Sequence, residues 1–94
     1  MVSYLVERYL PRARLDDLAA SVERAARLAA DVAMPDGPRY LSSTFLADEE
    51  TCLCRFEALD REAVAELNRR ADFPFDRIVE AVDLLPTREC TEGA

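Results

Sequence analysis

The sequence predicts an α+β fold in which one antiparallel sheet is covered by helices on a single face. Two observations predict it. Four stretches alternate in polarity as strands do, and two stretches repeat apolar residues at helical spacing. Their order along the chain is β-α-β-β-α-β. With right-handed crossovers, this order gives a four-stranded sheet in the order 4-1-3-2, the ferredoxin-like arrangement.

The first half of the chain is expected to form a strand, a helix and a second strand. Residues 3–10 alternate and end at Pro11, which cannot donate to a central ladder. Residues 15–33 carry an apolar line at helical spacing, and the turn-rich stretch 35–38 stops that helix. Residues 39–47 alternate again and predict the second strand.

The second half is expected to repeat this pattern. Residues 51–58 alternate strictly and follow a short acidic connection, which predicts a hairpin with the preceding strand. Asp60 is placed to cap a helix over 61–71 by accepting from the free amides of its first turn. Residues 76–84 form the fourth predicted strand.

The alternation assigns each strand residue to one of two faces. The helix-covered face is expected to hold Tyr4, Val6, Leu41, Phe45, Cys52, Cys54, Phe56, Val79 and Ala81. The open face is expected to hold Leu5, Glu7, Tyr9, Tyr40, Ser42, Leu46, Leu53, Arg55, Glu57, Ile78, Glu80 and Val82. Roughly half of the open set is large and apolar, more than soluble monomers usually expose. We therefore expect a homodimer with opposed open faces and a barrel-like cavity between them.

Composition narrows the class of protein. The 94 residues are expected to form one domain over 1–85 and a flexible tail over 86–94. The net charge of −7 and the absence of a Lys/Arg cluster argue against nucleic acid and anionic membranes as partners. No apolar run reaches the roughly 20 residues that cross a bilayer, and no signal peptide is recognised, so we expect a cytoplasmic protein.

The cysteines suggest two alternatives. Three cysteines are an odd number, so a disulfide framework is not expected. Cys52 and Cys54 share one face of a strand, where they could bridge a thiophilic metal such as Ni(II). Equally, they could be small buried hydrophobic residues. Cys90 lies in the predicted tail and receives no role.

Polar residues on the open face suggest a second candidate site. Glu7, Arg55, Glu57 and Glu80 could form an ion-pair network, hold a divalent cation, or supply a general base. The hydroxyl groups of Tyr9, Tyr40 and Ser42 could bind a ligand there or satisfy protein groups. Because the sequence has no histidine, the usual near-neutral acid or base and the commonest metal ligand are absent.

Several short motifs together resemble one protein family. They are Tyr4-Leu5-Val6-Glu7, Ser43-x-Phe45, Cys52-x-Cys54-x-Phe56-Glu57-Ala58, Glu62-Ala63-Val64 with Asn68, and Phe73-Pro74-x-Asp76-Arg77-Ile78-x-Glu80-Ala81-Val82. In this order and spacing, the motifs resemble a family of small bacterial proteins described as nickel-responsive or nickel-binding and ferredoxin-like. The resemblance implies a dimeric α/β-barrel and nickel binding. The matching positions are Glu7, Ser43, Cys54, Glu57, Asn68 and Glu80.

These observations lead to one preferred function and two alternatives. We expect a cytoplasmic dimer that binds nickel or another divalent metal, without an organic cofactor. The candidate metal ligands are Glu7, Glu57, Glu80, Cys52 and Cys54. The first alternative is a cofactor-independent enzyme or binding protein of the monooxygenase, isomerase or cyclase kind, with a small hydrophobic ligand in the sheet cavity. The second is an accessory protein without a ligand. The sequence leaves open whether the protein is an enzyme.

Overall fold

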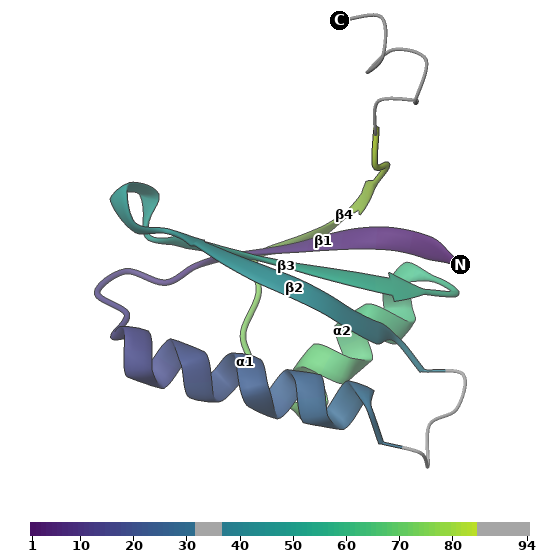
Figure 1. Cartoon of the computed structure of the whole chain (residues 1–94), viewed down its shortest axis with the longest axis horizontal. Coiled ribbons are helices and arrows are strands. Elements are labelled where there is room, and N and C mark those ends of the chain that lie inside the picture. The colour runs from purple at the N-terminus through teal and green to yellow at the C-terminus, as the bar shows by residue number, and fades with distance from the viewer. Residues whose placement is uncertain (32–36, 85–94) are drawn as a thin grey trace, which may run out of the picture.

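A computed structural model of the chain describes residues 1–31 and 37–84. The elements in order are β1 (Val2–Tyr9), α1 (Leu15–Ala29), β2 (Arg39–Leu46), the short 3-10 helix η1 (Ala47–Glu49), β3 (Thr51–Ala58), α2 (Arg61–Arg70) and β4 (Arg77–Ala81). The strands form one antiparallel sheet in the order β2-β3-β1-β4, which is the predicted order read from the other edge. Both helices lie against the same face of this sheet (Figure 1).

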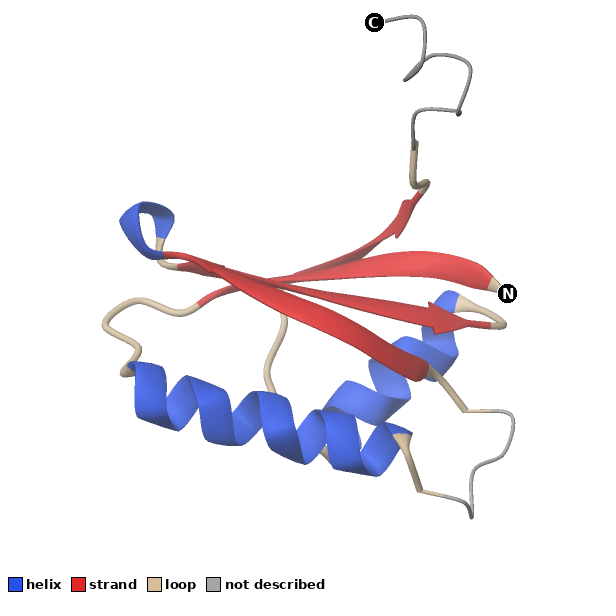
Figure 2. Ribbon diagram, in the orientation of Figure 1, coloured by secondary structure: helices blue, strands red, loops and turns tan. Residues whose placement is uncertain are grey.

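Figure 2 shows the two helices as one layer against the sheet. The hydrophobic core is formed by side chains of both layers. Val6 of β1 and Phe56 of β3 are fully buried, and α2 contributes Val64 and Leu67 from its apolar face. On β3, every second residue from Cys52 to Ala58 is buried, as the strict alternation of the sequence predicts. The arrangement confirms the predicted α+β architecture.

The helix boundaries follow capping and the helix dipole. The carboxylate of Asp60 accepts a hydrogen bond from the Ala63 amide at 2.8 Å, which confirms the predicted cap of α2. The predicted helix over 15–33 ends earlier than expected, at Ala29. Asp31 follows the negative end of that helix, where a carboxylate is unfavourable. Residues 32–36 of the prediction lie outside the described residues.

A bulge in β2 corrects the predicted faces of two residues. The pairing of β2 with β3 shifts between Tyr40 and Ser42, because Tyr40 pairs with Phe56 and Ser42 with Arg55. Tyr40 therefore lies on the helix-covered face, where its ring meets Phe56 edge-on at 5.6 Å between centroids. Leu41, which was expected on that face, is exposed.

The register of β4 corrects a second set of predicted faces. Ile78 pairs with Val6 and Glu80 pairs with Tyr4, so both lie on the helix-covered face. Val79 and Ala81 lie on the open face instead. A shift of one residue exchanges every side chain between faces. The strand also ends at Ala81, before the predicted residue 84, because its partner β1 begins at Val2.

Some predictions fall outside the described residues. The predicted tail over 86–94, with Cys90, is among them. Within 1–31 and 37–84, neither helix has the length and apolar character that crossing a membrane requires.

Candidate functional site

The open face of the sheet holds five of the predicted site residues. These residues are Glu7, Tyr9, Ser42, Arg55 and Glu57. The strand pairing places them in rows across the sheet, and the Leu5–Arg55 pair forms the middle row. Glu7 lies two residues beyond Leu5, and Glu57 lies two residues beyond Arg55 in the opposite direction. About 13 Å along the strands therefore separates the two glutamates.

Each open-face charge already has a partner. Glu7 pairs with Arg77 at 3.1 Å, and Glu57 pairs with Arg39 at 3.5 Å. Arg55 pairs with Asp83. The two glutamate side chains are one quarter to one third exposed, whereas their arginine partners are more than two-thirds exposed. Both ion pairs are therefore largely solvated, and each contributes little to stability.

The predicted metal ligands do not come together within one protomer. Glu7 and Glu57 are far apart on the open face, whereas Glu80, Cys52 and Cys54 lie on the other face. Among the residues that the structure describes, no group of three acidic, cysteine or histidine side chains is placed to hold a metal ion. One protomer alone therefore does not provide the predicted nickel site.

The structure instead builds a compact polar cluster beneath the helix-covered face. Cys52 and Cys54 are both about 1% exposed, and their sulfur atoms lie 3.8 Å apart. They remain free thiols. Two residues apart on β3, they point to the same side of the strand. This places two sulfur atoms side by side in the core.

A chain of hydroxyl groups leads from β2 to one of these thiols. The Tyr40 hydroxyl donates to Ser43 Oγ at 2.9 Å, and the Ser43 hydroxyl donates to Cys54 Sγ at 2.9 Å. Tyr40 and Ser43 are half-buried on an edge strand. The chain therefore links a buried sulfur to the rim of the sheet.

A fully buried arginine completes the cluster. Arg8 of β1 is 0% exposed and pairs across the sheet with Cys52. Its guanidinium donates to the carbonyl oxygens of Phe73 at 3.1 Å and Pro74 at 3.2 Å, and to Asn68 Oδ1 at 3.0 Å. It also lies 3.5 Å from the centroid of the Phe73 ring. Its Nε is buried without a hydrogen-bond partner.

The cluster separates the acidities of the two thiols. A hydrogen bond from Cys52, the positive charge of Arg8 and a hydrogen bond from Ser43 lower the pKa of Cys54 to about 6, against desolvation by burial. The hydrogen bond to Cys54 and burial raise the pKa of Cys52. The pKa of Cys54 therefore lies below that of Cys52, so Cys54 is the first of the two thiols to lose its proton.

The same arginine makes the thiol pair a poor cation site. A buried guanidinium repels a metal ion, and the neighbouring side chains Asn68, Ser43 and Tyr40 provide no second anion. Cys52 and Cys54, which were predicted as metal ligands, therefore lie beside a fixed positive charge in the core, apart from the carboxylates of Glu7 and Glu57.

Sequence reasoning missed the central member of this cluster. Arg8 stands in phase with Tyr4 and Val6, which were both assigned to the helix-covered face. An arginine at a core position of a strand is the signal that could have identified it. Ser43 and Asn68 entered only through the family resemblance. Tyr40, predicted for the open cavity, belongs to this cluster because of the bulge.

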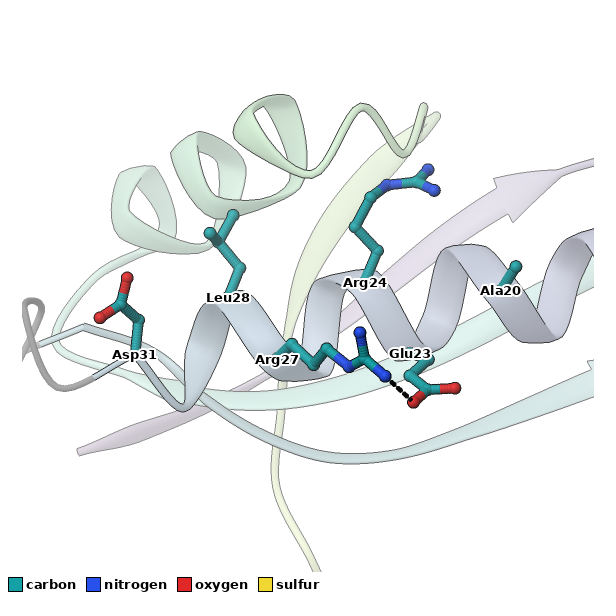
Figure 3. Close-up of a pocket in the computed structure, with 6 residues that line it drawn as sticks. All are labelled: Ala20, Glu23, Arg24, Arg27, Leu28 and Asp31. Carbon is teal, nitrogen blue, oxygen red and sulfur yellow. Dashed lines mark hydrogen bonds and ion pairs between the residues drawn. The ribbon is translucent and has the colours of Figure 1, made fainter.

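A separate hollow of about 580 Å³ lies along α1. Figure 3 shows its lining, which includes Glu23 and Arg27 joined at 2.7 Å and Leu28 and Arg24 on the side nearer α2. Arg24 donates to the carbonyl oxygens of Ala71 and Asp72 at the end of α2. This surface connects the two helices and contains none of the predicted site residues.

Comparisons with known proteins give one family and one fold relative. A family model described as "Nickel responsive protein SCO4226-like" matches residues 4–81. The chain is similar to the crystal structure of SCO4226 from Streptomyces coelicolor A3(2), with a TM-score of 0.74 and 15% identity. The match covers 88% of this chain and 99% of the other. No curated protein matches this chain significantly.

Proposed function

Because the chain belongs to the SCO4226-like family of nickel-responsive proteins, we propose that it is a cytoplasmic homodimer that binds a divalent metal between its open sheet faces. Nickel is the metal that the family description suggests. The observation that carries the proposal is the open face, where the partly exposed carboxylates of Glu7 and Glu57 lie beside half-buried leucines. The free thiols in the core are consistent with a reducing compartment.

The argument for a second copy starts from the uncovered sheet. Both helices lie on one face, so nothing among the described elements covers Leu5, Leu53 and Val79 on the other (Figure 1). Leu46 and Tyr9 add exposed apolar surface at one end. A patch of this kind favours association. A second copy is the simplest occupant, since two-fold pairing buries the same surface on both chains.

The placement of the glutamates suggests how a dimer would bring carboxylates together. Glu7 and Glu57 lie at equal steps on opposite sides of the Leu5–Arg55 row. A two-fold axis that crosses the strands at this row would bring Glu7 towards Glu57 of the partner subunit. The same operation generates a second, equivalent site. The proposal therefore requires two metal ions per dimer.

The arginine partners leave both carboxylates available to a cation. Arg77 and Arg39 are 67% and 69% exposed, so a metal ion could displace them at small cost. When bound, the ion would be held by carboxylate oxygens, because the sequence contains no histidine. Oxygen ligands discriminate weakly among divalent metals. We therefore expect Mn(II) to compete with Ni(II).

Native mass spectrometry of the untagged chain with and without Ni(II) tests the proposal. The expected result is a dimer that gains two nickel ions at micromolar metal. Glu7→Gln and Glu57→Gln should each abolish stoichiometric uptake and leave the dimer intact. Glu80→Gln is the matched control, since that glutamate lies on the other face, and it should bind as the parent does.

Three results would contradict the proposal in different ways. A monomer at micromolar concentration would remove the shared site altogether. A dimer whose nickel uptake is unchanged in both glutamine variants would exclude these carboxylates as ligands. A dimer that binds no metal but is stabilised by a small hydrophobic ligand would favour the alternative function in the sheet cavity.

A further inference from the structure

The buried charge of Arg8 needs an anion that no carboxylate provides. Its three hydrogen-bond acceptors are the neutral oxygens of Asn68, Phe73 and Pro74. None of the ion pairs among the described residues includes it. A buried charge is costly unless an opposite charge lies nearby. Cys52 and Cys54 are the neighbouring groups that can become negative, and the hydrogen bond that Ser43 donates to Cys54 favours a thiolate there, which would balance the guanidinium.

The geometry around Cys54 is that of a prepared sulfur nucleophile. Its sulfur accepts from Ser43 at 2.9 Å and lies 3.8 Å from the sulfur of Cys52. The charged or titratable groups that act on it are Arg8 from β1 and Cys52 from its own strand, and Ser43 from β2 donates to it. Tyr40 is bonded to Ser43 and the neutral Asn68 of α2 to Arg8, so both are one hydrogen bond further away. The Nε of Arg8 is buried without a hydrogen-bond partner, which is rare in protein cores. This is a second, independent indication that the cluster accommodates a further charged or polar group.

We propose that Cys54 and Cys52 form a reversible redox pair, in which Cys54 reacts with a hydroperoxide and Cys52 resolves the product. Arg8 and Ser43 hold the reacting sulfur in place. The proposal is independent of the metal site proposed above, because its residues lie on the opposite face of the sheet.

The first step oxidises Cys54. Its thiolate attacks one oxygen of the hydroperoxide, so that an S–O bond forms and the O–O bond breaks. The sulfur becomes a sulfenic acid and the peroxide is reduced. With hydrogen peroxide, the leaving hydroxide takes a proton along the Ser43–Tyr40 hydroxyl chain from solvent and becomes water.

The second step closes a disulfide. The sulfur of Cys52 attacks the oxidised sulfur of Cys54, so that the S–S bond forms and the S–O bond breaks. Hydroxide leaves with the proton that Cys52 gives up, which yields the second water. The net reaction converts one hydrogen peroxide and two thiols into one disulfide and two waters.

Strand geometry makes this disulfide easy to reverse. Alternate residues of a strand have Cα atoms about 6.6 Å apart, near the upper limit of roughly 6.8 Å for bridged cysteines. The sulfurs must also close from 3.8 Å to a bond length of about 2 Å. The bridge therefore strains β3, and strained disulfides are the readily reduced ones.

The hydroxyl chain that ends at the buried sulfur begins on the edge strand β2. Tyr40, the outer member of the hydroxyl chain, borders a hollow of about 200 Å³ lined also by Arg39 and by Ala26, Ala29 and Ala30 of α1. Because Cys54 is 1% exposed, the proposal calls for a small oxidant, and a bulky alkylating reagent should leave the folded protein unmodified. The structure therefore favours a hydroperoxide over a protein thiol as the reactant.

The test uses the full chain with Cys90→Ser, treated with a chelator to remove metal, and hydrogen peroxide as the probe. Samples are quenched, unfolded and alkylated, and the mass of the intact chain is measured by mass spectrometry. The expected product lacks two hydrogens, has no alkylated thiol and is restored by dithiothreitol. In Cys52→Ser, the chain should gain one oxygen and be trapped by dimedone. In Cys54→Ser, the reaction should be lost.

Variants of the surrounding residues separate positioning from structure. Ser43→Ala should slow oxidation about tenfold, the worth of one hydrogen bond to a charged sulfur. Ser42→Ala is the matched control, since Ser42 faces the open side, and it should react normally. Arg8→Gln should move the pH midpoint of the reaction upward from about 6, and Arg8→Lys should restore it. Circular dichroism confirms that each variant is folded.

Three outcomes would overturn the proposal. The first is a native protein whose two thiols stay reduced under peroxide that oxidises the urea-unfolded chain. The second is equal rates for Ser43→Ala and Ser42→Ala. The third is a pH midpoint that Arg8→Gln leaves unchanged. Nickel binding plays no part in these measurements. A negative result here therefore leaves the metal proposal unaffected, and a negative result in the nickel experiment leaves the redox proposal unaffected.

Discussion

At the scale of single residues, the most informative side chain is Arg8. Guanidinium stays charged at any ordinary pH, and its planar fork matches three fixed oxygen acceptors and stacks on the Phe73 ring. Lysine could supply the charge but neither the fork nor the stacking. The residue thus places a permanent positive charge in the core of an acidic protein, beside two sulfur atoms.

The pH dependence of stability should reveal the charge on Cys54. Its pKa is lowered from 9.0 to about 6 in the folded chain, so between these values the unfolded state binds more protons. Stability should therefore rise from pH 6 to pH 9, by at most about 4 kcal/mol. Urea unfolding under reducing conditions, at constant ionic strength, measures this rise.

The matched variant for this measurement is Cys54→Ser, which should flatten the profile over the same interval. Cys52 contributes the opposite sign, because its raised pKa stabilises the folded chain at low pH and loses that effect above about 9. A parent profile that is flat or falls between pH 6 and 9 would contradict a thiolate at Cys54.

At the scale of elements, the sequence predicts faces well only where alternation is unambiguous. On β3, two cysteines and a phenylalanine alternate with Leu53, Arg55 and Glu57, and the predicted faces are confirmed. On β4, Ile78 and Val79 are both apolar, so either register satisfies the pattern. On β2, a single bulge moves Tyr40 to the helix-covered face and Leu41 away from it, and the residue pattern does not predict the bulge. The faces of the β4 residues are set by the pairing of β4 with β1, and those of Tyr40 and Leu41 by the pairing of β2 with β3.

The candidate site was predictable in part for the same reason. The shared face of Glu7, Arg55 and Glu57 follows from alternation, but their separation along the strands needs the pairing register. The buried cluster draws Arg8 from β1 and Asn68 from α2, which lie 60 residues apart in the sequence. Contacts between such distant residues arise from tertiary packing, and local patterns do not encode them.

The end of α2 offers a stability prediction at this scale. Asp72 follows the helix with φ of 53°, in the left-handed region that favours glycine. Asp72→Gly should raise the free energy of unfolding by roughly 0.5–1 kcal/mol. Glu66→Gly, inside α2, is the control and should lower it by about 1 kcal/mol. Urea unfolding of both variants measures these changes. A lower free energy of unfolding for Asp72→Gly than for the parent would contradict the prediction.

At the scale of the whole molecule, the uncovered sheet face should control association. Leu5→Glu places a carboxylate opposite Arg55, which a single chain tolerates because this face is open to solvent. In a dimer with opposed open faces, the same carboxylate would be buried in the interface at a cost in free energy. We expect this variant to be monomeric at micromolar concentration. Light scattering coupled to size-exclusion chromatography measures the mass.

The control for this prediction lies on the other side of the molecule. Leu15 is 67% exposed on α1, and Leu15→Glu should leave the dimer unchanged. If both variants or neither changed the mass, the open face would not be the interface.

The position of β1 has a consequence for how the chain folds. The first strand of the sequence lies between β3 and β4, and the donors of Arg8 reach acceptors 60 to 66 residues away. Such distant contacts give a high contact order, which slows folding. As the chain leaves the ribosome, β1 can pair with β3 only after residue 58 has emerged, and Arg8 meets its acceptors only once residue 74 has emerged. The four-stranded sheet can therefore assemble only after β4 has emerged, and until residue 74 is available the guanidinium of Arg8 stays hydrated.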